Sequence, residues 1–292
     1  MPSDAFKALV EQLFASPLPE DFPAMREAYL GMGDAFPLPG DIVVEQATIG
    51  GCPCEWVTAP GTPANTILLL HGGGFCIGGP GSHRHLAGEV ARQTGARVVQ
   101  LDYRLAPEHP YPAGLDDALA TYAALAAMFP GERIALVGDS AGGGLALALL
   151  ARILRDGLHK PASVYCMSPW ADLTDRASSR TGKAALDPLA SSALLNRMAQ
   201  AYAGGTALDA PEISPVFADF RGAPPVLIQV GTAEVLMDDS INLAKALGDA
   251  DVDVDLDIRA GMIHVWPWFA PAIPEGQLAL GRACQFLKAN FG

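Results

Sequence analysis

The chain has 292 residues, of which 50% are hydrophobic and 17% charged, and its formal net charge is −13. This composition is typical of a soluble globular protein with a sizeable core. The negative charge disfavours nucleic acid or an anionic membrane surface as a partner, because both would repel the protein. No apolar run reaches the roughly 18–20 residues of a membrane span. The first residues also lack a signal-peptide pattern, so we expect a cytoplasmic protein.

The first 40 residues and the stretch that follows differ in pattern. Residues 4–14 and 24–31 are predicted to form two short helices, and from residue 42 runs of β-branched residues alternate with helical segments. The predicted strands cover residues 42–47, 55–58, 66–70, 98–101, 134–137, 164–167, 226–230 and 254–258. The predicted helices between them cover residues 85–93, 115–128, 145–154, 240–247 and 277–288.

Several central strands are apolar throughout, which is typical of a mostly parallel sheet covered by helices on both faces. The pattern therefore predicts an α/β fold with one catalytic domain, formed by residues 41–175 and 214–292. Residues 176–213 interrupt it as an insertion with a helix over 191–202. We expect residues 1–40 and 176–213 to pack together as a cap, or lid, over the functional site.

The five cysteines are too few, and odd in number, for the disulfide framework of a small secreted domain, so we expect reduced thiols. Cys52 and Cys54 lack the second pair of ligands that a structural zinc site needs. The apolar surroundings of the other three indicate buried thiols: Cys76, Cys166 and Cys284.

The stretch Gly138-Asp139-Ser140-Ala141-Gly142 lies between a predicted strand and a predicted helix. A G-x-S-x-G sequence in that setting is a nucleophile elbow, in which Ser140 projects above the sheet. The turn is so tight that the residues two before and two after the serine have no room for a side chain. Such a pattern can also be an ordinary turn, so its meaning depends on the rest of the chain.

A serine nucleophile needs donors for the oxyanion, and His71-Gly72-Gly73-Gly74-Phe75 follows the strand predicted at 66–70. We expect the N–H groups of Gly73 and Gly74 to form the oxyanion hole, with that of Ala141 as the third donor. The alternatives are a flexible loop or a phosphate cradle, but the cradle's lysine and Ser/Thr are missing.

The base should follow the last strand, because α/β-hydrolases carry nucleophile, acid and base in that order. Only His159 and His264 follow Ser140. His159 comes too soon and is expected in solvent, whereas His264 lies in the loop after residues 254–258. Among the earlier histidines, His71 is expected to be a buried support of the oxyanion loop. The others are expected at the surface: His83, His85 and His109.

The acid should lie in the loop after residues 226–230, where three carboxylates compete. Glu234 is nearest the end of the strand, where catalytic residues of open α/β sheets gather. Asp238 and Asp239 precede the helix predicted at 240–247 and are explained as caps favoured by the helix dipole. We favour Glu234 over Asp238, and Asp238 stays as the alternative.

Taken together, these residues resemble the hormone-sensitive-lipase-like carboxylesterases, the bacterial family IV esterases of the α/β-hydrolase superfamily. Besides the elbow and the oxyanion loop, the resemblance rests on two further segments and on the loops of Glu234 and His264. The two segments are Asp102-Tyr103-Arg104-Leu105-Ala106-Pro107-Glu108-His109-Pro110-Tyr111-Pro112-Ala113 and Ser168-Pro169-Trp170-Ala171-Asp172-Leu173. All occur in the family's order.

The resemblance implies an eight-stranded, mostly parallel sheet with a helical cap. It further implies that the protein hydrolyses small-molecule esters with short acyl chains and needs no cofactor. It also implies a structural ion pair between Arg104 and Glu108. The family's acid is commonly an aspartate at the position of Glu234, although glutamate also occurs there. Relatives dimerise through the last strand, which makes a homodimer near residues 254–258 an expectation, although the aspartates there could oppose edge pairing.

Two alternatives follow from the same residues. Another acyl hydrolase, such as a peptidase, lactonase or amidase, would use the same site. A receptor is the alternative of a different class: the plant gibberellin receptors keep the fold but lack the histidine, and His264 favours the enzyme. The acyl length accepted should depend on the cap residues Phe14, Met25, Leu30, Leu194 and Met198.

Overall fold

The computed structural model describes residues 2–61 and 63–292 and contains an eight-stranded sheet in the order β1-β2-β4-β3-β5-β6-β7-β8. The pairs β1–β2 and β2–β4 are antiparallel, and the remaining pairs are parallel. The strands are β1 (Val43–Ile49), β2 (Cys52–Thr58), β3 (Thr66–Leu70), β4 (Arg97–Leu101), β5 (Ile134–Asp139), β6 (Val164–Met167), β7 (Val226–Gly231) and β8 (Val254–Arg259). The predicted α/β class, the eight strands and the mostly parallel sheet are confirmed.

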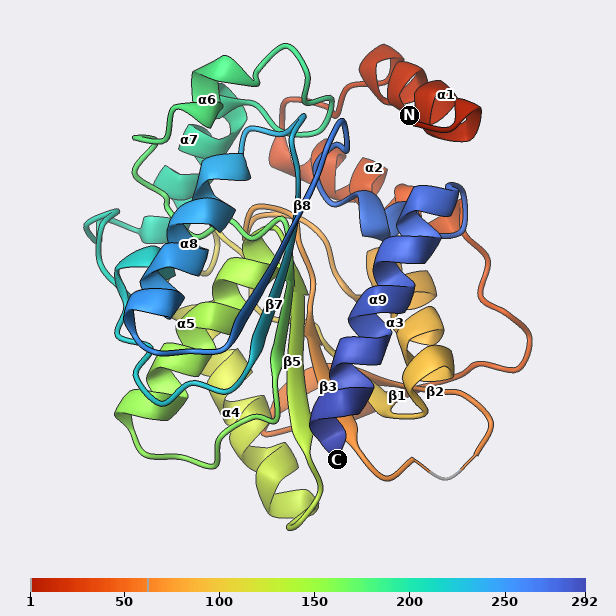
Figure 1. Cartoon of the computed structure of the whole chain (residues 1–292), viewed down its shortest axis with the longest axis vertical. Coiled ribbons are helices and arrows are strands. Elements are labelled where there is room, and N and C mark those ends of the chain that lie inside the picture. The colour runs from red at the N-terminus through yellow and green to blue at the C-terminus, as the bar shows by residue number, and fades with distance from the viewer. Residues whose placement is uncertain (1, 62) are drawn as a thin grey trace.

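Helices cover both faces of this sheet (Figure 1). The helices α3 (Pro80–Thr94) and α9 (Pro274–Phe291) lie on one face. The other face is covered by α4 (Ala113–Met128), α5 (Ala141–Arg155) and α8 (Met237–Asp249). Each face has its own core, because neighbouring residues of a strand point in opposite directions: Leu68 belongs to the core under α4 and α5, and Leu69 to the core under α3 and α9. Every residue of β3 and β5 is buried, as their apolar sequences predict.

Four further helices lie together at one end of the molecule (Figure 1). Two come from the N-terminal segment, α1 (Asp4–Ala15) and α2 (Phe22–Asp34), and two from the insertion, α6 (Ser179–Gly182) and α7 (Ser192–Ala203). The two segments touch, because the Arg197 guanidinium lies 4.9 Å from the ring centre of Phe22. The sequence pattern missed α6 and the 3-10 turns Pro215–Phe217 and Trp266–Phe269, which are too short to show a helical period.

Two expectations about single residues were wrong. His83 and His85 are buried on α3, not at the surface. The resemblance also implied a pair between Arg104 and Glu108, but the guanidinium of Arg104 pairs with Asp117, and Glu108 pairs with Arg26 of α2. By contrast, the five cysteines are buried free thiols.

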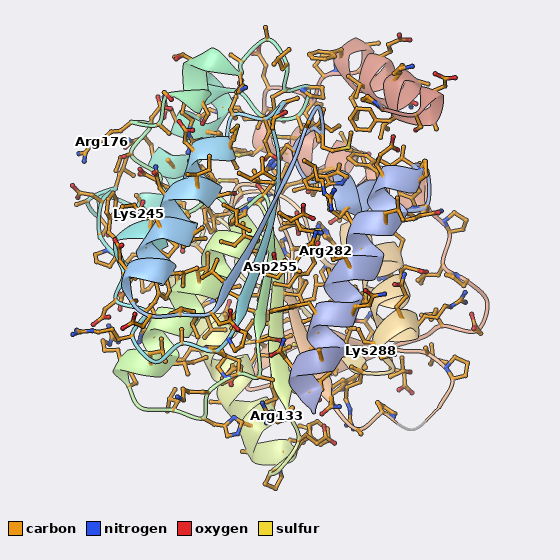
Figure 2. The ribbon with its side chains drawn as sticks, viewed as in Figure 1. Arg133, Arg176, Lys245, Asp255, Arg282 and Lys288 are labelled. Carbon is orange, nitrogen blue, oxygen red and sulfur yellow. The ribbon has the colours of Figure 1, made fainter. Side chains whose placement is uncertain are left out.

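The edge strand β8 is acidic on the side that faces α9. Asp255 pairs with Arg282 of α9 at 3.2 Å, and Figure 2 shows the two side chains between strand and helix. A homodimer through this edge stays a prediction. In the part of the chain that the structure describes, no helix combines the length and the apolar composition needed to cross a membrane.

Candidate active site

Ser140 lies between β5 and α5 in the strained backbone conformation of an elbow, with φ of +50° and ψ of −120°. A Cβ atom on Gly138 would lie 2.3 Å from the carbonyl oxygen of Gly142. A Cβ on Gly142 would lie 2.0 Å from the carbonyl oxygen of Leu70. Both positions therefore exclude any side chain, which confirms the steric reading of the motif.

The glycine loop after β3 presents its backbone to the same place. Gly73 and Gly74 have φ values of +114° and +59°, which favour glycine. Within the described residues, the N–H groups of Gly73 and Gly74 make no hydrogen bond to the protein. Ala141 is the first residue of α5, so its N–H has no partner inside the helix. Three donors, at the positive end of a helix dipole, are thus free to bind an anionic oxygen.

His71 is a buried support of this loop, as expected. It is buried, and burial lowers its pKa to about 3, so the ring is neutral. Its Nδ1–H donates to the carbonyl oxygen of Gly72 at 2.7 Å. The ring stacks on Tyr103 with 4.2 Å between ring centres, and the Tyr103 hydroxyl donates to the His71 carbonyl at 2.8 Å.

Asp139, next to Ser140, also holds the glycine loop. Its Oδ1 accepts the N–H of Gly72 at 2.9 Å and lies 3.0 Å from His83 Nε2. Burial alone would raise the pKa of Asp139, but the charge and hydrogen bond of His83 outweigh burial and lower it. Helical spacing could have identified His83 as buried, because it shares a face of α3 with the buried Leu86 and Val90.

The loops after β7 and β8 bring Glu234 and His264 together. His264 Nδ1 lies 2.9 Å from Glu234 Oε2, and both side chains are buried. The other oxygen, Oε1, accepts the Gly231 N–H at 2.6 Å and the Ser168 hydroxyl at 2.9 Å. The carboxylate is therefore held at both oxygens, and it fixes the imidazole with Nδ1 protonated and Nε2 able to accept a proton.

The pKa values of this pair follow from burial and mutual contact. Burial raises the pKa of Glu234, although the hydrogen bond from His264 opposes it. Burial disfavours the imidazolium of His264, but the hydrogen bond and charge of Glu234 outweigh burial and raise the pKa of His264 above 6.5. This environment favours an imidazole that takes up a proton during a reaction.

Asp238 lies away from His264. Its Oδ2 accepts hydrogen bonds from the Ser178 hydroxyl at 2.7 Å and the Ser179 N–H at 2.9 Å. Asp238 and Asp239 lie in the first turn of α8, where the helix dipole favours them as expected, but the expectation that they cap the helix was wrong, because both carboxylates bind the insertion instead. Glu234, not Asp238, is the carboxylate placed against His264.

Ser140, His264 and the glycine loop line one cavity of about 70 Å³. Its polar lining includes Ser140, His264, Gly73 and Gly74, and its apolar lining comes largely from the N-terminal segment, the insertion and the segment after His264. The apolar residues include Leu18, Met32, Leu189, Leu194, Met198, Val265, Trp268 and Phe269. No hydrogen bond between Ser140 and His264 occurs among the described residues, and such contacts often tighten only with substrate.

The expected pocket residues are therefore only partly right. Leu194 and Met198 line the cavity. Phe14 and Leu30 are exposed instead, and Leu30 lines a separate groove beside Gly79 and Gly81. Met25 lines a neighbouring groove rather than the cavity.

No group of three or more potential metal-ligating His, Cys, Asp or Glu side chains is found across residues 2–61 and 63–292. The groups that the site presents are a serine hydroxyl, an imidazole, a carboxylate and backbone N–H donors. A serine and an imidazole in one cavity, with a carboxylate bound to that imidazole and free N–H groups nearby, are a combination that suits acyl transfer.

Comparison with known proteins agrees with this fold. Residues 67–267 match the model of a family described as having the alpha/beta hydrolase fold. The chain is 43% identical to an acetyl-hydrolase of Streptomyces hygroscopicus over 87% of this chain and 84% of the relative. It is 33% identical to an esterase of Acinetobacter venetianus over 86% of this chain and 84% of the relative.

A solved structure extends the match to the whole chain. It is the crystal structure of an esterase from the bacterial hormone-sensitive lipase family, with a TM-score of 0.96 and 40% identity over 100% of both chains. The similarity thus includes the N-terminal helices and the insertion as well as the sheet. The chain belongs to the hormone-sensitive-lipase-like esterases of the α/β-hydrolase superfamily.

Proposed function

We propose that this protein is a carboxylesterase that hydrolyses short-chain acyl esters through an acyl-enzyme on Ser140. The observation that carries the proposal is the hydrogen bond between Glu234 and His264, whose imidazole lines the same cavity as Ser140. The esterase and acetyl-hydrolase relatives support ester hydrolysis as the activity.

In the first half of the reaction, Ser140 Oγ forms a bond to the ester carbonyl carbon, and its proton passes to His264 Nε2. The negative charge that develops on the carbonyl oxygen is met by the N–H groups of Gly73, Gly74 and Ala141. His264 then gives the proton to the departing alcohol, which leaves an acyl group on Ser140.

In the second half, His264 takes a proton from water, whose oxygen attacks the acyl carbon. The tetrahedral intermediate collapses, the Ser140 oxygen regains a proton from His264, and the carboxylic acid leaves. Throughout, Glu234 keeps Nδ1 of His264 protonated and stabilises the imidazolium. No cofactor is needed, since every proton moves between water, substrate and these side chains.

The small cavity supports short acyl groups as substrates. Its volume of about 70 Å³ leaves room for a few carbon atoms beyond the carbonyl, and Leu194 and Met198 close its side. We therefore expect rates with p-nitrophenyl esters to fall steeply as the acyl chain lengthens. A series from two to twelve carbons would measure this.

We also propose that residues 1–40 and 176–213 act together as a cap. The contact of Arg197 with Phe22 and the lining that both segments contribute to the cavity support this role. Hydrogen exchange tests it: amides of α2 and α7 should gain protection together when a serine-directed inhibitor binds. Protection of one segment without the other would contradict a shared cap.

Replacing Ser140 tests the function directly. The Ser140→Ala variant should lose turnover of p-nitrophenyl acetate and butyrate, and a fluorophosphonate probe should label the wild type but not the variant. Near-full activity in the variant would refute the mechanism. Tight binding of small molecules without labelling would favour a receptor, and a panel of esters, amides and lactones separates the other acyl hydrolases.

A further inference from the structure

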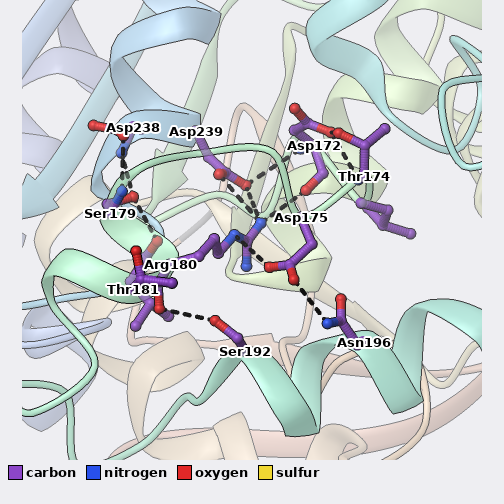
Figure 3. Close-up of polar contacts among 12 residues, drawn as sticks. Asp172, Thr174, Asp175, Ser179, Arg180, Thr181, Ser192, Asn196, Asp238 and Asp239 are labelled. Atoms are coloured by element: carbon purple, nitrogen blue, oxygen red, sulfur yellow. Dashed lines mark hydrogen bonds and ion pairs between the residues drawn. The ribbon is translucent and has the colours of Figure 1, made fainter.

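Arg180 lies on the short helix α6 of the insertion, yet its side chain is buried and reaches the catalytic domain. Its Nη2 donates to Asp239 Oδ1 and Oδ2 at 3.0 and 3.2 Å, and to the Asp172 carbonyl oxygen at 2.8 Å. Figure 3 shows this guanidinium next to Asp172, Asp175 and Asp239, and its Nε lies 3.9 Å from Asp175 Oδ1. Asp239 belongs to the first turn of α8, and Asp172 follows β6. One nitrogen therefore joins the insertion to the start of α8 and to the loop after β6.

The loop after β6 contacts both the nucleophile and the acid. The Trp170 N–H donates to the carbonyl oxygen of Ser140 at 2.9 Å. The Ser168 hydroxyl donates to Glu234 at 2.9 Å. Trp170 Nε1–H also donates to the carbonyl oxygen of Asp172, the same atom that Arg180 binds. A shift of this loop would therefore move Ser140 and Glu234, two members of the proposed triad.

The acid loop is bound by the insertion as well. Val235, which follows Glu234, donates its N–H to Asp187 Oδ2 at 2.9 Å and accepts the Ser179 hydroxyl at its carbonyl at 2.7 Å. Both polar groups of this peptide backbone are therefore held by residues of the insertion. Asp239 continues the contact one turn further along the chain.

The same cluster reaches the wall of the cavity. The Ser192 hydroxyl donates to the carbonyl oxygen of Arg180 at 2.8 Å, and Asn196 donates to Asp175 at 2.8 Å (Figure 3). Both donors lie on α7, the helix that carries Leu194 and Met198 into the cavity. Hydrogen bonds therefore connect the wall that a substrate touches with the loop that carries Glu234.

We propose that Arg180 is a positioning residue for the reaction: it holds the acid loop and the loop after β6 in the arrangement that sets Glu234 and Ser140 against His264. The inference rests on the proposed function, since positioning has meaning only if these residues react. The inference gives the insertion two parts. The part around α6 is anchored to the catalytic domain, and helix α7 contacts substrate. Arg180 touches neither substrate nor the reacting atoms.

Stability and positioning must be separated in the test, because Asp239 is fully buried. Removing Arg180 alone would leave a buried carboxylate without its charge partner, which destabilises a fold. Burial raises the pKa of Asp239 to about 7, against the opposing charge of Arg180. Asp239→Asn removes that charge while its amide oxygen can still accept the N–H of Asp172.

The experiment therefore compares Arg180→Met, the double variant Arg180→Met/Asp239→Asn, and Arg180→Lys. The matched control is Arg176→Met, because Arg176 belongs to the same insertion but lies at the outer edge of the molecule (Figure 2), 70% exposed. For each variant, kcat and KM with p-nitrophenyl butyrate, the Tm, and the downfield proton resonance of the Glu234–His264 hydrogen bond are measured.

We expect kcat to fall about 10- to 100-fold in the double variant with KM within about twofold, as for a small displacement of reacting groups. The Tm of the double variant should be higher than that of Arg180→Met. Its downfield resonance should shift from the wild-type position. Arg180→Lys should restore part of the kcat that Arg180→Met loses. The control should match the wild type. A double variant with wild-type kcat would overturn the inference, as would a rise in KM at unchanged kcat.

These outcomes remain distinct from a failure of the proposed function. If Ser140→Ala kept its activity, the mechanism itself would be wrong. If Ser140→Ala were inactive while the double variant and Arg180→Lys both turned over like the wild type, only the role of Arg180 would be refuted. Should the double variant fail to fold, Arg180→Lys decides, because it keeps the charge but cannot bind Asp239 and Asp172 in the same geometry.

Discussion

The Ser168 hydroxyl donates a hydrogen bond to Glu234 Oε1 at 2.9 Å and accepts the Val265 N–H at 3.1 Å. It thus connects the acid to the residue that follows His264. Ser168 itself has a φ of +44°, an uncommon conformation for a residue with a side chain. One hydroxyl therefore fixes Glu234 and the loop of His264 relative to each other.

Removing this hydroxyl should slow the reaction. We expect Ser168→Ala to lower kcat about 10-fold, since a hydrogen bond to a charged group contributes about 1.5 kcal/mol. Ser168→Gly also lacks the hydroxyl but suits the positive φ, so it should be the more stable of the two while equally slow. Steady-state kinetics and thermal unfolding measure both effects. Normal kcat in the glycine variant would show that the hydroxyl does not position Glu234.

A comparison of two carboxylates tests the identity of the acid. Glu234→Gln should lower kcat by about 10⁴, by analogy with the acid-to-amide change in a serine protease, because the imidazole loses its orienting carboxylate. Asp238→Asn should change kcat little, because Asp238 binds Ser178 and Ser179 rather than His264. The reverse ranking would assign the acid to Asp238.

Chain order and chemistry were enough to predict the strands, the elbow and the approach of the Glu234 and His264 loops, whereas the oxyanion role of Gly73 and Gly74 stays a prediction. The same reasoning favoured Glu234 but left Asp238 open, because both carboxylates follow β7 within seven residues. The choice depends on where the loop turns: Gly231 donates to Glu234 and folds it inward, whereas Asp238 is drawn to the insertion. The contact of Asp238 with Ser179 joins residues 59 positions apart, which no local pattern records.

Ion-pair partners were hard to predict for the same reason. Arg104 and Glu108 are neighbours in sequence, yet each binds a residue from another segment, Asp117 and Arg26 respectively. Arg180 was missed altogether, since a charged residue in an insertion normally faces solvent. Only its burial and its contact with Asp239 distinguish it from Arg176 nearby.

The pH dependence of the reaction should reflect His264. The base must be neutral in the free enzyme, and its pKa is raised above 6.5 because the hydrogen bond and charge of Glu234 outweigh burial. The activity kcat/KM should therefore fall as the pH decreases, with a midpoint above 6.5. In Glu234→Gln the residual activity should persist to lower pH, because the carboxylate that raises the pKa is gone. A wild-type midpoint at or below 6.5 would contradict this coupling.

Arg26 connects the N-terminal helix α2 to the oxyanion loop. Its guanidinium donates to the carbonyl oxygens of Cys76 and Ala106 at 2.8 Å each and pairs with Glu108. Cys76 in turn donates its N–H to Gly73 at 3.1 Å. We expect Arg26→Ala to lower the free energy of unfolding by about 1–3 kcal/mol, because two buried carbonyls lose their donor. It should also lower kcat, because the loop loses a support.

Glu108→Gln is the matched control for Arg26. The side chain of Glu108 is 55% exposed, so the pair itself should contribute less than about 1 kcal/mol. Urea unfolding of both variants measures the difference. An equal loss in the two variants would mean that the ion pair, and not the carbonyl contacts, holds the helix to the loop.

Buried histidines should make the fold sensitive to acid. Burial lowers the pKa of His85 to about 4 and that of His71 to about 3, from 6.5. Below pH 6.5 the unfolded chain therefore binds more protons than the folded one, so the free energy of unfolding decreases as the pH falls towards 4.

The His85→Gln variant isolates one of these histidines. It keeps an N–H donor for the Trp268 carbonyl oxygen, which His85 Nε2 meets at 2.9 Å, but it cannot titrate. Between pH 7 and 5 the variant should lose about 1–2 kcal/mol less of its free energy of unfolding than the wild type does. Urea unfolding at both pH values measures the two losses. Equal losses would mean that groups other than His85 cause the acid sensitivity. If His85 is buried and neutral in the folded protein, only the unfolded chain takes up its proton in this pH range, and that must lower the free energy of unfolding of the wild type.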